Sequence, residues 1–95
     1  VEAIGMQDVI YTDTWISMGD EDASNKAKIL AHFAPYQVNH LLMTKANASV
    51  VMHCQPAHLE EEITTELFDS DMAVVFQQAE NRMWAQNAVL VSLLT

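Results

Sequence analysis

One cysteine stands where several residues capable of chemistry come together in the sequence. Residues 50–58, VVMHCQPAH, place Cys54 after an apolar run and directly beside His53. Such a pair can serve nucleophilic catalysis or bind a metal. Alternation along a strand, however, directs His53 and Cys54 to opposite faces, no acid completes a Cys-His pair, and His58 gives no zinc-ligand spacing. A small buried thiol is the alternative to a functional one, and we expect no metal.

Pro56 suggests another use for this stretch. An X-Pro bond after a strand can be cis, and a cis bond fixes a sharp turn. Such a turn would direct the backbone carbonyls of Cys54 and Gln55 into a cleft. There they would accept hydrogen bonds from the NH₂ or NH₃⁺ groups of a ligand.

Asp13 ends a second run of β-branched and aromatic residues, DVIYTD, and leads into the loop TWISMGDED. Its carboxylate either accepts backbone N–H groups at the strand end or holds a substrate ammonium group. With the second alternative, Ser17 would supply a hydroxyl and Gly19 would let the loop move.

Arg82 is the only arginine in a chain with four basic residues against thirteen acidic ones. We predict a helix from about residue 79, so Arg82 falls in its first turn, where the helix dipole disfavours a cation. One explanation is a surface pair with Glu80 or Asp71. The other is that Arg82 and the free N–H groups of that turn receive an anion together.

Strands and helices alternate along the rest of the chain. Strands are predicted at 8–13, 49–54 and 73–76, and helices at 25–32, 40–46, 65–69 and 79–94, with Asn39 and Thr64 as N-caps. This order predicts an α/β fold with a parallel sheet in three layers. Ligands of such sheets bind beyond the carboxyl ends of the strands, which marks Asp13, Cys54 and the segment QQAENR.

Two further expectations concern burial. The apolar positions of the last helix are predicted to belong to the core: Trp84, Ala88, Leu90, Val91 and Leu94. The acidic run at 60–62 is predicted to be solvated.

The composition bounds the class of protein. Ninety-five residues make one small domain or part of a larger one, and the chain opens without Met, so we expect a piece of a longer protein. A net charge of −9 would repel phosphate backbones, so we expect no nucleic-acid partner. Neither a membrane span nor a signal peptide is visible. The lone cysteine suits a reducing compartment, and we expect the cytoplasm.

Four stretches taken together resemble the C-terminal part of the ornithine carbamoyltransferases, in the aspartate/ornithine carbamoyltransferase family: DVIYTDTWISMG, PYQVN, MHCQPAH and AENRMWAQNAVLVSLL. The similarity covers nearly the whole chain. It implies part of a Rossmann-like amino-acid-binding domain over residues 1–95, with the carbamoyl-phosphate domain absent. It also implies carbamoyl transfer from carbamoyl phosphate to the δ-amine of L-ornithine, giving L-citrulline and phosphate in arginine metabolism.

The resemblance also assigns roles to residues. Asp13, Ser17 and Met18 resemble the residues that hold the α-amino and carboxylate end of ornithine, and Cys54 resembles the cysteine at its side chain. The main chain of Cys54 and Gln55 and the side chain of Arg82 resemble the carbamoyl phosphate contacts. Cys54 and Arg82 are thus the catalytic candidates.

The resemblance further implies that the enzyme uses no metal or organic cofactor, forms no covalent intermediate and assembles as a trimer or a multiple of trimers. Gln55 departs from the usual leucine of the family, and Leu59 departs from an arginine common in bacterial members. The motifs Ser-Thr-Arg-Thr and His-Pro-Thr-Gln do not occur here. We therefore expect the 95-residue chain alone to be inactive. The alternatives are a non-catalytic, regulatory amino-acid-binding module and a carbamoyltransferase for another amine.

Overall fold

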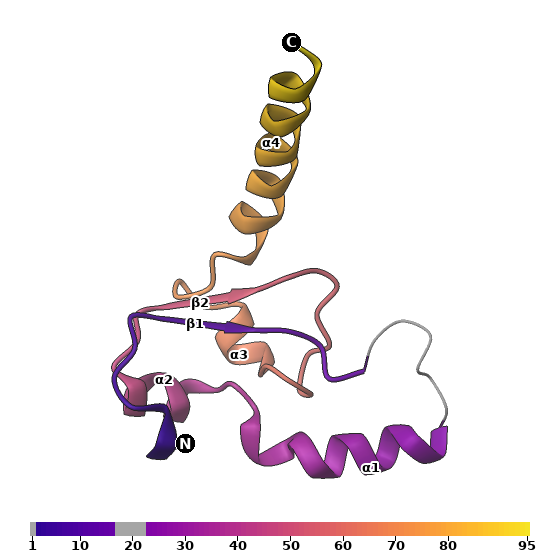
Figure 1. The fold of residues 1–95 in the computed structure, drawn as a ribbon. Coiled ribbons are helices and arrows are strands. Elements are labelled where there is room, and N and C mark those ends of the chain that lie inside the picture. Colours follow the sequence, from indigo (N-terminus) through magenta and orange to yellow (C-terminus); the bar gives the residue numbers. More distant parts are fainter. Residues whose placement is uncertain (1, 17–22) are drawn as a thin grey trace.

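The computed structural model describes residues 2–16 and 23–95 (Figure 1). Its elements, in chain order, are η1 (Glu2–Ile4), β1 (Val9–Thr12), α1 (Ala23–Phe33), η2 (Ala34–Tyr36), α2 (His40–Ala46), β2 (Val50–His53), α3 (Thr65–Phe68) and α4 (Val75–Leu94), where η marks a short 3-10 helix. The α/β class with a parallel sheet is confirmed. None of the described helices is both long enough and apolar enough to cross a membrane.

The two strands run side by side and in the same direction. β1 pairs with β2 in a register that sets Val9 against Val50 and Thr12 against His53. Both strands therefore end at the same edge of the sheet (Figure 1). The residues that follow them, Asp13 and Cys54, are brought together although 41 positions separate them in the sequence.

The predicted third strand at 73–76 is wrong. Only Ala73 bridges Val51, in parallel orientation, and α4 already begins at Val75. The run AVVF has the β-branched composition of a strand, but strand propensity depends strongly on the surroundings. Here the chain turns into a helix as soon as Val74 has donated its N–H to the Val51 carbonyl at 3.2 Å.

The core lies between the strands, α2 and α3. Val51, Ile63 and Leu67 are fully buried and Met43 is almost so. Each such side chain contributes about 1.5–3 kcal/mol relative to an exposed position. The core helices are capped as predicted: the Asn39 side chain accepts from the Leu42 N–H at 2.9 Å, and the Thr64 hydroxyl from the Leu67 N–H at 3.3 Å. Packing and caps together hold β2 in place.

α4 extends away from the sheet (Figure 1), and only its first residue, Val75, is buried. The predicted burial of its apolar positions is therefore wrong for this chain. Trp84, Leu90, Val91 and Leu94 expose between 55% and 82% of their surface, and Ala88 is exposed as well. The apolar pattern is that of a core helix, but the described residues provide no layer that covers it. A contiguous apolar surface of this kind favours association.

We predict that the 95-residue chain, purified alone, self-associates through α4. Sedimentation velocity should show larger species as the protein concentration rises. Replacing Leu90 and Leu94 together by Gln should shift the distribution towards monomer, because the apolar area buried on association falls. The matched control is Asn87→Gln, which changes a polar position of the same helix. A monomer at every concentration, or equal association of both variants, would contradict the prediction.

Candidate active site

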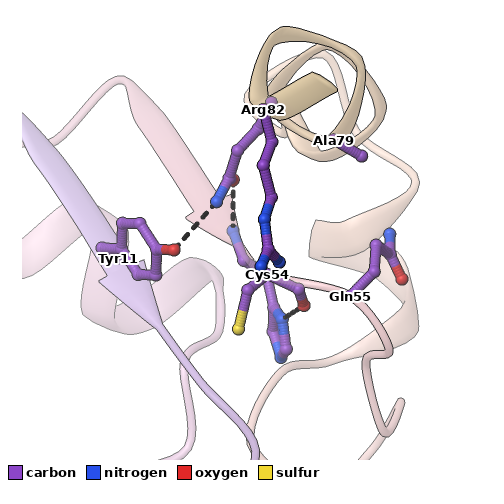
Figure 2. Close-up of a pocket in the computed structure, with 7 residues that line it drawn as sticks. Tyr11, Cys54, Gln55, Ala79 and Arg82 are labelled. Atoms are coloured by element: carbon purple, nitrogen blue, oxygen red, sulfur yellow. Dashed lines mark hydrogen bonds between the residues drawn. The ribbon is translucent and has the colours of Figure 1, made fainter. Parts of the chain in front are cut away.

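A cavity of about 480 Å³ lies at the carboxyl edge of the sheet. Its walls come from β1, from the end of β2 and from the start of α4, and include Tyr11, Cys54, Gln55, Ala79 and Arg82. Figure 2 shows the Arg82 side chain reaching down from α4 towards Cys54, with Tyr11 and Gln55 on either side. The cavity lies beyond the strand ends, where the sequence predicts a ligand site.

Asp13 and Cys54 are in direct contact. The Cys54 thiol donates to Asp13 Oδ1 at 3.0 Å, and the backbone N–H of Thr14 donates to the same oxygen at 2.6 Å. Asp13 also lines a neighbouring cavity of about 470 Å³, together with Tyr11 and Trp15. The thiol–carboxylate contact thus joins a residue that lines one cavity to a residue that lines the other, and Tyr11 lines both.

This contact fixes the protonation of both groups. The thiol hydrogen bond, followed by the Thr14 N–H, lowers the pKa of Asp13 below its usual value. The same hydrogen bond, together with burial and the negative charge of Asp13, raises the pKa of Cys54. At neutral pH the pair is therefore a carboxylate and a neutral thiol. A neutral thiol whose hydrogen is donated to Asp13 is a poor nucleophile, and its sulfur remains a weak hydrogen-bond acceptor.

His53 faces away from the thiol, as the strand alternation predicts. It is fully buried, and its ring Nε2 lies 2.6 Å from Glu62 Oε1. The other ring nitrogen, Nδ1, contacts the backbone carbonyl of Cys54. His53 therefore supports the main chain at the site and does not form a catalytic pair with the thiol.

Glu62 is a residue that the sequence analysis missed. The acidic run at 60–62 was expected to be solvated, but Glu62 is fully buried while Glu60 is exposed. Glu62 Oε1 also accepts the backbone N–H of His58 at 2.7 Å. Sequence spacing gives no sign of this burial, because it depends on how the loop after Pro56 folds back onto β2.

Gln78 was also missed. Its side-chain carbonyl accepts the His53 backbone N–H at 3.0 Å, and its amide donates to the Tyr11 hydroxyl at 3.0 Å. It joins both strand ends to α4 and so positions the first turns of that helix. The segment QQAENR had been marked as part of the site, but the role of this glutamine follows only from the three-dimensional contact.

Arg82 lies in the predicted place but not in the predicted turn. Because α4 begins at Val75, Arg82 is in the second turn of the helix. The free backbone N–H groups belong to the first turn of α4, before Arg82. The pairing with Glu80 or Asp71 is also wrong: among the described residues Arg82 makes no ion pair within 4 Å, and Glu80 accepts from the Trp84 indole instead. Arg82 instead lines the cavity at the end of the sheet.

The peptide bond between Gln55 and Pro56 is cis, as the sequence suggested. Ser17, Met18 and Gly19 lie outside the described residues. His58, Glu61 and Glu62 come within 4.8 Å of one another, but a cation there would compete with His53 and the His58 N–H for the same carboxylate.

Comparison with known proteins decides the family. The sequence profile of the aspartate/ornithine carbamoyltransferase Asp/Orn binding domain matches residues 1–93. The chain belongs to the aspartate/ornithine carbamoyltransferase family. The resemblance of the motifs around Asp13, Cys54 and Arg82 to this family is therefore confirmed.

Individual carbamoyltransferases support the same relation. The ornithine carbamoyltransferase of Shewanella oneidensis is 55% identical over 95 residues, which are all of this chain and 31% of the relative. That of Methanocorpusculum labreanum is 50% identical over 96 residues, again all of this chain and 31% of the relative. The chain thus spans about a third of the length of these relatives.

Solved structures of carbamoyltransferases have the same fold. The anabolic ornithine carbamoyltransferase of Campylobacter jejuni superposes with a TM-score of 0.83 at 34% identity, covering 97% of this chain and 30% of that one. The Pyrococcus furiosus ornithine carbamoyltransferase gives a TM-score of 0.75 at 48% identity, covering 94% and 28%.

We predict that Asp13→Asn makes Cys54 more reactive. Removing the carboxylate charge lowers the thiol pKa towards its ordinary value, so more thiolate is present at a given pH. The initial rate of alkylation by iodoacetamide at pH 8, followed by mass spectrometry of the Cys54 peptide, should rise at least about threefold in the full-length protein. Asp71→Asn, at an exposed position, is the matched control. A rate unchanged by Asp13→Asn would contradict the assigned contact.

Proposed function

We propose that this chain is part of an enzyme that transfers the carbamoyl group of carbamoyl phosphate to the δ-amine of L-ornithine, giving L-citrulline and phosphate. The observation that carries the proposal is the meeting of Asp13, Cys54 and Arg82 at one edge of the sheet, in a chain 55% identical to an ornithine carbamoyltransferase. As the chain covers about a third of such relatives, the activity belongs to the longer protein.

The cavity beside Arg82 suits carbamoyl phosphate. The backbone carbonyls of Cys54 and Gln55 are hydrogen-bond acceptors and match the NH₂ group of the carbamoyl moiety. The Arg82 guanidinium is a donor of fixed positive charge and matches the oxygens of the reacting group. Groups held in place by the strand ends and by α4 would lower the cost of binding in a reactive geometry.

The neighbouring cavity suits the amino acid. The Asp13 carboxylate matches the α-ammonium group of ornithine, and the proposal assigns Ser17 and Met18 to the same end of the substrate. The neutral Cys54 thiol would contact and orient the δ-amine. The thiol and the carboxylate lie side by side, 3.0 Å apart, so both groups are at the same end of the sheet.

The chemistry then needs no covalent enzyme intermediate. The neutral δ-amine attacks the carbamoyl carbon and forms a C–N bond, and the carbonyl oxygen gains negative charge that cationic and N–H donors stabilise. As the C=O bond re-forms, the C–O bond to phosphate breaks, phosphate leaves with the electron pair, and the amine nitrogen gives up one proton to the departing phosphate. Orientation and electrostatic stabilisation are the contributions of the protein.

The proposal extends to the pathway, the compartment and the assembly of the enzyme. We assign the reaction to arginine metabolism in the cytoplasm and the assembly to a trimer or a multiple of trimers. These assignments rest on the family relation. Covering of the exposed apolar residues of α4 by another part of the longer protein would agree with them.

The proposal is tested by assaying the full-length protein for citrulline. We expect turnover with carbamoyl phosphate and ornithine at a kcat/KM at least about 10²-fold above that with putrescine or N-acetylornithine, because only ornithine presents both an α-ammonium and a free δ-amine. The 95-residue chain alone should give no turnover. Absence of citrulline with the full-length protein, or preference for another amine, would overturn the proposal.

Arg82→Ala should lower kcat/KM of the full-length enzyme at least about 10²-fold, or about 2.7 kcal/mol, because a charged contact to the reacting group is lost. Lys45→Ala, which removes an exposed positive charge at the end of α2, is the control for net charge. Near-normal kinetics of the Arg82 variant would remove this residue from the site.

A further inference from the structure

Tyr11 is a residue of β1 that lines both cavities of the candidate site. It contributes to the cavity of Arg82 and Cys54 and also to the neighbouring cavity of Asp13. The residue is 58% exposed, and its phenol ring points from the strand towards α4 (Figure 2). The hydroxyl group is therefore within reach of a ligand at the carboxyl edge of the sheet.

The hydrogen bonds of Gln78 fix the direction in which this hydroxyl donates. The backbone N–H of His53 can only donate, so the Gln78 atom that lies 3.0 Å from it is the side-chain oxygen. The amide nitrogen of Gln78 then faces the phenol oxygen of Tyr11, at 3.0 Å. An NH₂ group also only donates, so the phenol oxygen is the acceptor.

The hydroxyl hydrogen of Tyr11 is thereby left without a partner in this part of the chain. A phenol group carries one hydrogen to donate in addition to the lone pairs with which it accepts. Among the described residues, the hydrogen bond of the Tyr11 hydroxyl is the one that it accepts from Gln78. Its own hydrogen is therefore available to an acceptor that enters the cavity.

The cavity beside Arg82 requires further donors if it holds a phosphate ester. Among the described residues that line it, Arg82 is the only Lys or Arg, and the main-chain carbonyls of Cys54 and Gln55 are acceptors. A hydroxyl directed into this cavity offers a hydrogen to a phosphate or carbamoyl oxygen. In the neighbouring cavity the proposed partner of Asp13 is an ammonium group, which donates and does not accept.

We propose that Tyr11 is a substrate-binding residue that donates its hydroxyl hydrogen to an oxygen of carbamoyl phosphate; this inference rests on the proposed function. Gln78 is the positioning residue, because its NH₂ group occupies the phenol oxygen and turns the hydroxyl hydrogen towards the ligand. Gln78 and Arg82 lie four positions apart in α4 and therefore on one face of the helix. The same helix face thus directs both donors at the ligand.

Tyr11→Phe in the full-length protein removes the hydroxyl and keeps the ring. We expect calorimetry to show binding of carbamoyl phosphate at least about tenfold weaker, because a hydrogen bond to a charged group is lost. kcat/KM for carbamoyl phosphate should fall at least as much, while KM for ornithine should change less than about threefold. Tyr36→Phe is the matched control, because it removes the same atom from a tyrosine that lines other cavities. It should leave the affinity for carbamoyl phosphate unchanged.

A second background separates contact with the ligand from support of Gln78. Gln78→Met keeps an unbranched side chain of similar length and removes its hydrogen bonds to both strand ends. If Tyr11 acted only by holding Gln78, Tyr11→Phe would have no further effect in this background. We expect the double variant to bind carbamoyl phosphate at least about fivefold more weakly than Gln78→Met alone. Equal affinities of these two proteins, or of Tyr11→Phe and the unmodified protein, would overturn the role of Tyr11.

Two readouts keep this test apart from that of the proposed function. The affinity for carbamoyl phosphate, measured without ornithine, tests the contact of Tyr11, and citrulline formation tests the reaction. A loss in Tyr11→Phe that appears only in KM for ornithine would assign the hydroxyl to the amino acid and contradict the inference. An unmodified protein that binds carbamoyl phosphate more tightly than Tyr11→Phe but makes no citrulline contradicts the proposed function alone. One that does not bind carbamoyl phosphate contradicts both.

Discussion

The parallel pairing of β1 with β2 is the constraint on which the site depends. The register that sets Thr12 against His53 brings the next residue of each strand, Asp13 and Cys54, to the same edge of the sheet. A shift by one residue would turn each side chain to the other face. The contact between thiol and carboxylate, and with it the protonation of both, would then be lost.

α4 contributes the cation to this edge because the chain enters the helix early. The predicted strand at 73–76 shrinks to the bridge between Ala73 and Val51, and the turn that follows brings Gln78 within hydrogen-bond reach of β2. Arg82 lies one turn further on, above the cavity (Figure 2). The same geometry directs the rest of α4 away from the sheet, which leaves apolar side chains exposed.

Two buried polar side chains behind the site restrict the path of the neighbouring main chain. His53 and Glu62 are both fully buried, yet each is tied to a backbone group of the segment around Cys54. Most buried polar groups in proteins are hydrogen-bonded. The loop after the cis Gln55–Pro56 bond therefore follows a path determined largely by these hydrogen bonds.

The sequence alone determined the α/β class, the parallel strands, the N-caps at Asn39 and Thr64 and the family. These features depend on the residue types of short segments and on sequence motifs, and both can be read from a single sequence. The tertiary structure decided the end of the sheet, the start of α4 at Val75, the exposure of its apolar residues and the burial of Glu62. Each of these depends on which distant segment packs against which, and neither hydrophobic period nor charge pattern contains that information. The same holds for the Asp13–Cys54 contact, which joins residues 41 positions apart only because two strands lie side by side.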